Sequence, residues 1–219
     1  MSKTENPQHS VANRADDTDD ARMFAPAAAR NGDAIVAALV PLLPETGRAL
    51  EIASGTGEHV VKLAAALPGL TWHPTDIEED RLTSIAAWTA HEKLTNIEAP
   101  MAFNAVTQVW DKAKMDAIYL ANLIHLISNE AAISLIAKLA SICAPTGHIA
   151  IYGPFKRGET FASEGDESFD TSLRLRDPTI GYKSIEWVDQ QFANHGLQPT
   201  QRIAMPANNI LTLWSRTAS

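Results

Sequence analysis

Two acidic residues lie at a glycine-rich turn that follows the first predicted strand of the chain. The stretch RALEIASGTGEH (residues 48–59) carries Glu51 inside an apolar run and Glu58 directly after Gly55 and Gly57. Glycine-rich turns of this kind usually bind a phosphate group on the N–H groups of the following helix. A phosphate about 5 Å from a carboxylate is repelled by roughly 3 kcal/mol at an effective dielectric constant of about 20. The pattern therefore disfavours a dinucleotide such as NAD.

The same carboxylate attracts a nucleoside that carries positive charge in place of phosphate. S-adenosylmethionine carries a sulfonium and an ammonium group, so Glu51 favours it, while the turn glycines allow the backbone to approach the ligand closely. The N–H groups of the following helix remain available for the methionine carboxylate. Asp76, 19 residues beyond Gly57, ends the next predicted strand, where its carboxylate can bind both ribose hydroxyls. Asp76 would serve NAD equally well, so this residue alone does not discriminate between the two ligands.

Further candidate residues follow the fourth and fifth predicted strands. His125 has an imidazole whose usual pKa suits a general base near neutral pH, although it can equally be a locally packed histidine. Tyr152 and Phe155 are candidate contacts for a methyl acceptor, with a core role as the alternative for Phe155. Arg174 and Arg176 can bind an anionic acceptor or pair with neighbouring acids. Methyl transfer depends mainly on orientation and desolvation, so a base is optional.

Composition limits the classes of partner. The chain has 219 residues with a net charge of −8, which suits one domain and disfavours nucleic acid as the main partner. The longest apolar run, AIVAALVPLL, is too short to cross a bilayer, and the N-terminus lacks a signal-peptide pattern, so we expect a cytoplasmic protein without a membrane partner. The single cysteine, Cys143, is expected on the apolar face of a helix as a buried thiol. The histidines show no metal-ligand spacing, so no metal is expected.

Strand and helix patterns alternate through the middle of the chain. Such alternation predicts a parallel sheet with helices on both faces and ligands at the carboxyl ends of the strands. The predicted strands cover residues 48–53, 70–75, 97–103, 116–121 and 148–153, and two more are expected at 198–205 and 209–215.

The remaining segments complete a single domain over residues 21–219. Residues 1–20 are polar and predict a disordered or loosely held tail. A helix is expected from Asn31 to Pro44. The polar stretch 154–183 is too long for an ordinary connection, and its place beside the active edge favours a lid over a disordered loop.

Several motifs resemble those of the class I S-adenosylmethionine-dependent methyltransferases. LEIASGTGEH is similar to their first motif, acid-x-Gly-x-Gly-x-Gly, with Ala53 at the first glycine, and HPTDIEEDRL is similar to the second. FNAVTQVW lies where the family usually has an acid for the adenine amino group, and LANLIH is similar to the fourth-strand motif. The donor-binding residues that this resemblance implies are Glu51, Ala53, Ser54, Gly55, Gly57, Asp76, Ile77, Asn104, Ala105, Asn122 and Leu123.

The motifs of this sequence resemble those of one branch of these enzymes more closely. RMFAPAAARN, NLIH, GPFKRG, SFDTSLRLRDP and MPANN occur in the order found in a methyltransferase-like family catalogued as a domain of unknown function. The resemblance covers residues 22 to 216 and implies a Rossmann-like α/β fold with a seven-stranded, mostly parallel sheet ending in an antiparallel hairpin. It also suggests that a helix before the first strand closes over the donor, with Arg30 binding the methionine carboxylate.

The sequence thus predicts an S-adenosylmethionine-dependent methyltransferase acting on an unidentified small molecule. One alternative is a non-catalytic module that binds S-adenosylmethionine or S-adenosylhomocysteine. Another is an NAD-dependent oxidoreductase, but Val60 replaces the last glycine of its fingerprint, and the Tyr152–Lys156 spacing is interrupted by Gly153-Pro154. The absence of an Asn-Pro-Pro-aromatic signature weakens adenine or glutamine nitrogens as acceptors, and the oligomeric state stays open.

Overall fold

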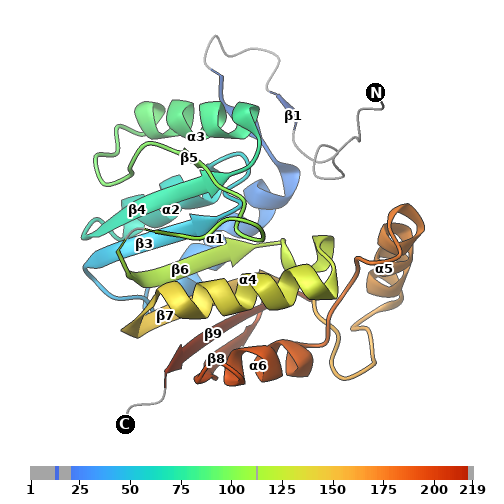
Figure 1. The fold of residues 1–219 in the computed structure, drawn as a ribbon. Coiled ribbons are helices and arrows are strands. Elements are labelled where there is room, and N and C mark those ends of the chain that lie inside the picture. The colour runs from blue at the N-terminus through green and yellow to red at the C-terminus, as the bar shows by residue number, and fades with distance from the viewer. Residues whose placement is uncertain (1–12, 15–20, 112, 217–219) are drawn as a thin grey trace.

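A seven-stranded sheet organises the chain (Figure 1). The computed structural model describes residues 13–14, 21–111 and 113–216. The strand order is β5-β4-β3-β6-β7-β9-β8. The strands of this sheet are β3 (Gly47–Ile52), β4 (Leu70–Asp76), β5 (Met101–Ala102), β6 (Met115–Ala121), β7 (Cys143–Gly153), β8 (Leu197–Ala204) and β9 (Ile210–Arg216).

The strand directions confirm the predicted Rossmann-like fold. The pairs β5-β4, β4-β3, β3-β6 and β6-β7 are parallel, whereas β9 pairs antiparallel with both β7 and β8. The chain order reverses between β3 and β6, so the carboxyl ends of these two strands form the switch point at which α/β sheets bind ligands.

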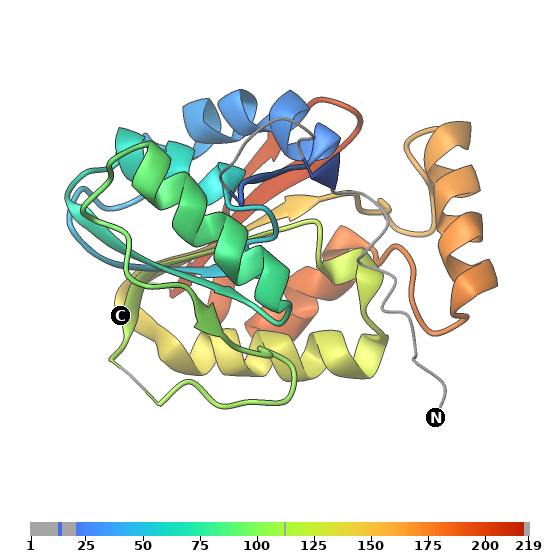
Figure 2. The same cartoon turned by 90° about the horizontal axis from the view of Figure 1, so that it is seen from above.

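Helices cover both faces of the sheet (Figure 2). Alternation along β3 sends Ala49 into the core beneath α1, α2 and α3, and Leu50 into the opposite core beneath α4 and α6. The helices are α1 (Pro26–Leu39), α2 (Glu58–Ala66), α3 (Glu79–His91), α4 (Asn129–Ile142), α5 (Glu164–Arg176), α6 (Ile185–Ala193) and the short 3-10 helix η2 (Ile124–Leu126).

Several boundaries differ from the sequence-based expectations. Helix α1 begins at Pro26, five residues before the expected start, because the alanine-rich PAAAR stretch is helix-forming but has no apolar periodicity. The strand expected at 97–103 shrinks to Met101–Ala102, next to Pro100, which has no N–H for a ladder hydrogen bond. Cys143 is buried as expected, but it begins β7 instead of lying within a helix.

The polar stretch 154–183 is not a structureless loop. It contains α5, which is capped by Ser163 accepting a hydrogen bond from Asp166 N and which lies beyond the carboxyl ends of the strands (Figures 1 and 2). Only Asp170 and Leu173 of this helix are buried, so it lacks the apolar stripe that marks a helix in sequence.

The N-terminal segment lies beside α3. Strand β1 (Asn13–Arg14) pairs antiparallel with β2 (Met23–Phe24), and the rest of the predicted tail lies outside the described residues. Within the described part of the chain, no helix combines the length and apolar character needed to span a bilayer.

Candidate functional site

Two adjacent strands end in residues with unusual backbone conformations. Ala53 follows β3 with φ of 53°, and Asn122 follows β6 with φ of 55°. Non-glycine residues rarely adopt this left-handed region, and such strain is concentrated at functional sites. Both residues were predicted to contact the donor, and the structure brings them to the same edge of the sheet.

The glycine-rich turn leaves open space where a ligand can approach. A Cβ atom on Gly55, whose φ is 58°, would meet no heavy atom within 4 Å. A Cβ atom on Gly57, whose φ is 93°, would lie 2.9 Å from the backbone of Ile85. Gly57 is therefore required for packing against α3, whereas Gly55 faces the candidate binding space.

Glu51 is a buried carboxyl beside this turn. Its side chain is 2% exposed, and it is paired in register with Tyr119 of β6. Among the described residues, neither Oε2 of Glu51 nor the hydroxyl of Tyr119 has a hydrogen-bond partner. Burial raises the pKa of Glu51 to about 8, opposed by a hydrogen bond from Ser54 and reinforced by the carboxyl of Asp76. Unpartnered buried polar atoms of this kind suit a polar or cationic ligand.

Glu58, the second acid at the turn, is buried and hydrogen-bonded within the protein. Its Oε2 accepts hydrogen bonds from Ala25 N at 2.7 Å and from Thr56 Oγ1 at 2.8 Å. Glu58 therefore ties the segment before α1 to the turn. The electrostatic argument against a pyrophosphate therefore depends on Glu51 and no longer on Glu58.

Asp76 lies at the carboxyl end of β4, as predicted. Its oxygens accept hydrogen bonds from the backbone N–H groups of Gly55, Ile77 and Glu78. Burial raises its pKa, while these hydrogen bonds and Arg81 act in the opposite direction. Ile77 beside it is 44% exposed, which gives the site an apolar surface suited to an adenine ring.

The other predicted donor residues differ in their availability. Ser54 is buried, and its N–H donates to the carbonyl of Thr75. Asn104 Oδ1 accepts hydrogen bonds from Val106 N at 3.0 Å and Thr107 N at 3.2 Å, which form a turn. Its contact with the adenine stays a prediction.

Two more residues of the predicted donor set are buried. Ala105 follows Asn104, and Leu123 follows Asn122 at the end of β6. Both pack into the core on the α4 side of the sheet.

His125 lies in η2, directly after β6, and is 5% exposed. Its ring contacts Phe169 and Tyr182 edge-on, with centroid distances of 6.0 Å and 5.8 Å. Burial lowers its pKa to about 4, and Lys183 acts in the same direction. The imidazole is therefore neutral at physiological pH and can accept a hydrogen bond.

The predicted acceptor contacts are not brought together. Phe155 belongs to the core beneath α4 and α6, so we omit it from the acceptor site. Burial raises the pKa of the Tyr152 hydroxyl, and the nearby side chains of Asn31 and Asn209 act in the opposite direction. Tyr152 therefore lies between α1 and the loop before β9 and offers little surface to an acceptor.

The predicted cationic contacts lie on the outer surface. Arg174 Nε donates to Asp170 Oδ2 at 2.7 Å, and Arg176 is exposed at the end of α5. Arg30 is exposed on α1, within electrostatic range of Tyr152. Arg174 and Arg176 belong to α5, whereas Arg30 lies near Tyr152 at the carboxyl end of β7, and its contact with the methionine carboxylate stays a prediction.

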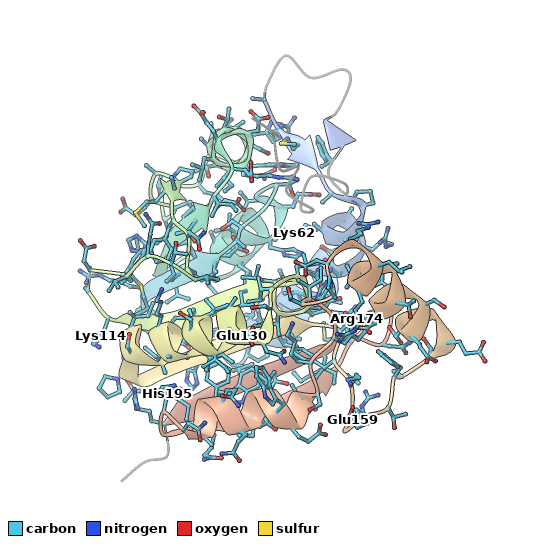
Figure 3. The ribbon with its side chains drawn as sticks, turned by 45° about the vertical axis from the view of Figure 1, so that its right-hand side comes forward. Lys62, Lys114, Glu130, Glu159, Arg174 and His195 are labelled. Atoms are coloured by element: carbon cyan, nitrogen blue, oxygen red, sulfur yellow. The ribbon has the colours of Figure 1, made fainter. Side chains whose placement is uncertain are left out.

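A pocket of about 400 Å³ lies between α4, α5 and the segment after β7. Figure 3 shows three charged residues of its wall, Glu130, Glu159 and Arg174. Lys156 Nζ pairs with Glu159 at 3.0 Å, and Arg174 pairs with Asp170, so these cations have partners within the protein. In the part of the chain that the structure describes, no group of three or more histidine, cysteine or acidic residues is arranged to hold a metal ion.

Tyr119 and Phe169 are the site residues that sequence reasoning missed. Tyr119 faces Glu51 only through the β3–β6 register, which no sequence pattern reveals. Phe169 had a signal, since it is an isolated aromatic residue in a polar stretch.

Several solved structures similar to this chain are methyltransferases. An O-methyltransferase family protein from Burkholderia thailandensis matches with a TM-score of 0.74 at 14% identity, over 86% of this chain and 57% of that protein. An O-methyltransferase family 2 protein from Planctomyces limnophilus, in complex with apigenin, matches with a TM-score of 0.71 at 18% identity, over 83% of this chain and 56% of that protein.

Human N-acetylserotonin methyltransferase in complex with S-adenosylmethionine matches with a TM-score of 0.68 at 15% identity, over 88% of this chain and 53% of that protein. This chain thus spans little more than half the length of these three proteins, and at such identities the likeness shows the fold. A family model described as "Protein of unknown function (DUF938)" matches residues 22–216. The chain belongs to this family, and its fold is that of the class I methyltransferases.

Proposed function

We propose that this protein transfers a methyl group from S-adenosylmethionine to a small-molecule acceptor. The observation that carries the proposal is the buried, unpartnered Oε2 of Glu51 beside the open space at Gly55. A buried carboxyl without a partner is costly, and a cationic ligand removes that cost. A pyrophosphate at the same place would increase it.

Each residue of the switch point binds a different part of the donor. Glu51 attracts the positive charge, Asp76 binds the ribose hydroxyls, and Ile77 packs against the adenine. The N-terminal N–H groups of α2 bind the carboxylate. The strained backbone at Asn122, together with Leu123, lies where the methyl group would be presented. When bound, S-adenosylmethionine supplies a methyl carbon activated by its positive sulfur.

His125 is the proposed recipient of the acceptor's proton. A neutral imidazole can accept a hydrogen bond from an acceptor hydroxyl and receive its proton during transfer. With a pKa of about 4 it is a weak base, so orientation and exclusion of water supply most of the rate. The segment 154–183, including α5, is the proposed cover of this side of the site.

Calorimetric titration tests the donor site directly. We expect S-adenosylmethionine to bind and NAD not to bind. Asp76→Ala should weaken the donor by at least about tenfold, since a hydrogen bond involving a charged group contributes roughly 1.5–3 kcal/mol. Asp80→Ala, on the exposed side of α3, is the matched control and should leave the affinity unchanged. Tight NAD binding without donor binding would contradict the proposal and favour an oxidoreductase.

Transfer itself is tested with an isotopically labelled donor. We expect incubation of the protein with cell extract and S-adenosylmethionine carrying a labelled methyl group to yield a labelled small molecule, identified by mass spectrometry. His125→Ala should slow this transfer while leaving donor affinity unchanged. Donor binding without any labelled product would instead indicate a non-catalytic binding module.

A further inference from the structure

Four aromatic rings meet between η2 and the segment that carries α5. Tyr182 lies at the centre, with ring centroids 5.8 Å from His125, 6.2 Å from Phe169 and 5.8 Å from Phe161. Phe169 also contacts His125 at 6.0 Å. This cluster places α5 against His125, which lies four residues beyond the end of β6.

The charged side chains beneath α5 are already satisfied within the protein. Asp170 is buried and accepts hydrogen bonds from Arg174 Nε and from Tyr182 N at 2.6 Å. Lys183 is buried and donates to the carbonyls of Ile127 and Gly181. Asp170 pairs with Arg174 and the hydrogen bonds of Lys183 go to backbone carbonyls, so these groups already have partners within the protein, which favours an acceptor that brings no charge of its own.

Phe169 is placed differently from the other apolar residues of α5. Leu173 is buried and attaches the helix to the rest of the molecule, whereas the ring of Phe169 is 46% exposed beside His125. Leu175 is 83% exposed and belongs to none of the hydrophobic core clusters of the described chain. Phe169 therefore offers an open aromatic surface next to the candidate base.

His125 also has unused hydrogen-bonding capacity. It is nine-tenths buried, and no described residue hydrogen-bonds its ring nitrogens; only its backbone carbonyl is engaged, by Gly181 N. A buried imidazole in this condition suits a ligand that donates a hydrogen bond. An aromatic surface and a hydrogen-bond acceptor thus lie side by side at the carboxyl end of β6.

We propose that the methyl acceptor is a neutral, planar aromatic compound bearing a hydroxyl group, held by Phe169 and oriented by His125. This inference rests on the proposed methyl transfer and adds its substrate class and a specificity-determining residue. The hydroxyl oxygen forms a bond to the methyl carbon, the carbon–sulfur bond breaks with its electron pair passing to sulfur, and the hydroxyl proton passes to His125 and then to solvent. A phenol suits a weak base because its hydroxyl is far more acidic than that of an alcohol.

Three probes and four variants test this acceptor site. Naphthol is the neutral aromatic probe, hydroxynaphthoate its anionic counterpart and cyclohexanol a non-aromatic alcohol, each assayed with labelled S-adenosylmethionine. We expect naphthol to be methylated in preference to the other two. Phe169→Ala and Phe169→Leu should raise KM for naphthol by about tenfold through loss of the aromatic contact and its buried area. Phe169→Tyr should keep the wild-type KM.

Leu175→Ala is the matched control, since it truncates an exposed apolar residue of the same helix, and it should change KM by less than about twofold. Donor affinity, measured first by calorimetry, should be equal in all variants. Equal KM values for the Phe169 and Leu175 variants would overturn the inference. So would donor binding without methylation of naphthol, or a preference for hydroxynaphthoate or cyclohexanol, and each would leave the donor site intact. A protein that binds no donor would instead remove the proposed function and this inference together.

Discussion

At the scale of single residues, Ala53 has an unfavourable backbone conformation and Glu51 an unfavourable buried position, both beside the candidate donor site. The left-handed conformation of Ala53 is about 1–2 kcal/mol less favourable for an alanine than a right-handed one. Glu51 is a buried carboxyl for which the described residues supply no salt bridge. Replacing Ala53 with glycine would remove the first cost. A bound cationic ligand would reduce the second.

Ala53→Gly should stabilise the protein. Glycine adopts φ near 53° without a steric penalty, although it adds entropy to the unfolded chain, so the net gain in unfolding free energy should be about 0.5–1 kcal/mol. Urea denaturation measures this difference. Ala102→Gly in β5 is the control, because its backbone lies in an ordinary strand and the same substitution there should be destabilising. Equal effects at the two positions would show that Ala53 carries no strain.

Glu51→Gln should change how stability depends on pH. The folded pKa of about 8 lies above the unfolded value of 4.5, so the folded state holds the proton more tightly than the unfolded state. The stabilising contribution of protonated Glu51 to the free energy of unfolding is fully present below pH 4.5 and is lost as the pH rises through 8. Between pH 5 and 8 the wild type should lose roughly 3 kcal/mol relative to the variant.

Urea denaturation at both pH values measures this difference, with Glu98→Gln as the exposed control that should retain the wild-type dependence. Parallel curves for wild type and Glu51→Gln would mean that the Glu51 carboxyl is ionised in the empty protein.

At the scale of elements, the segment containing β2 is fastened to the glycine-rich turn through buried polar groups. Ser84 of α3 accepts a hydrogen bond from Met23 N at 2.8 Å and donates one to the carbonyl of Thr56 at 2.7 Å. Trp88 Nε1 donates to the carbonyl of Met23, and the guanidinium of Arg22 lies 4.7 Å from the Trp88 ring. The position of the turn therefore depends on α3 and on the segment before α1.

Ser84→Ala should destabilise the protein and loosen this attachment. It leaves Met23 N–H and the Thr56 carbonyl without their partner, which should cost roughly 2–3 kcal/mol in urea denaturation. Hydrogen exchange of the Met23 amide should accelerate as well. Thr83→Ala removes a hydroxyl from the exposed neighbouring position and should change stability by less than about 0.5 kcal/mol. Similar losses in the two variants would contradict the role of Ser84.

At the scale of the whole molecule, the parallel sheet brings several separate stretches of sequence to one edge. The ends of β3, β4 and β6 supply Glu51, Asp76 and Asn122, which are 25 and 46 residues apart in sequence. The groups around Glu51 are the Asp76 carboxyl on β4, the Tyr119 hydroxyl on β6 and the Ser54 hydroxyl after β3. None of them is a cation, so any positive charge beside Glu51 would come from a bound ligand.

Donor binding should therefore release a proton. In the empty protein at pH 7, Glu51 is mostly protonated, because its pKa is about 8. A bound cation favours the carboxylate, so up to about one proton should leave per S-adenosylmethionine bound. As the pH rises toward 8, the dissociation constant should fall by up to about tenfold for each pH unit. Calorimetry in two buffers of different ionisation enthalpy measures the release. Glu51→Gln should abolish it, and equal proton release by wild type and variant would assign the proton to another group.

The sequence alone determined the class of fold and the candidate donor residues. Alternating strand and helix patterns, together with glycines and acids at strand ends, are local signals that survive into the folded chain because hydrophobic periodicity selects the face each residue buries. Gly55, Gly57, Asp76 and Ile77 are at the predicted edge for this reason.

Only the tertiary structure decided which of these groups are available to a ligand. Glu58 and Asn104 bond to the backbone, Phe155 lies in the core, and Tyr119 faces Glu51 through strand register. Helix α5 lacks an apolar stripe because few of its side chains are buried, so its placement of Phe169 beside His125 depends on long-range packing. A hydrogen-bond partner or a packing neighbour distant in sequence is a property of three-dimensional contact, and no local pattern carries it.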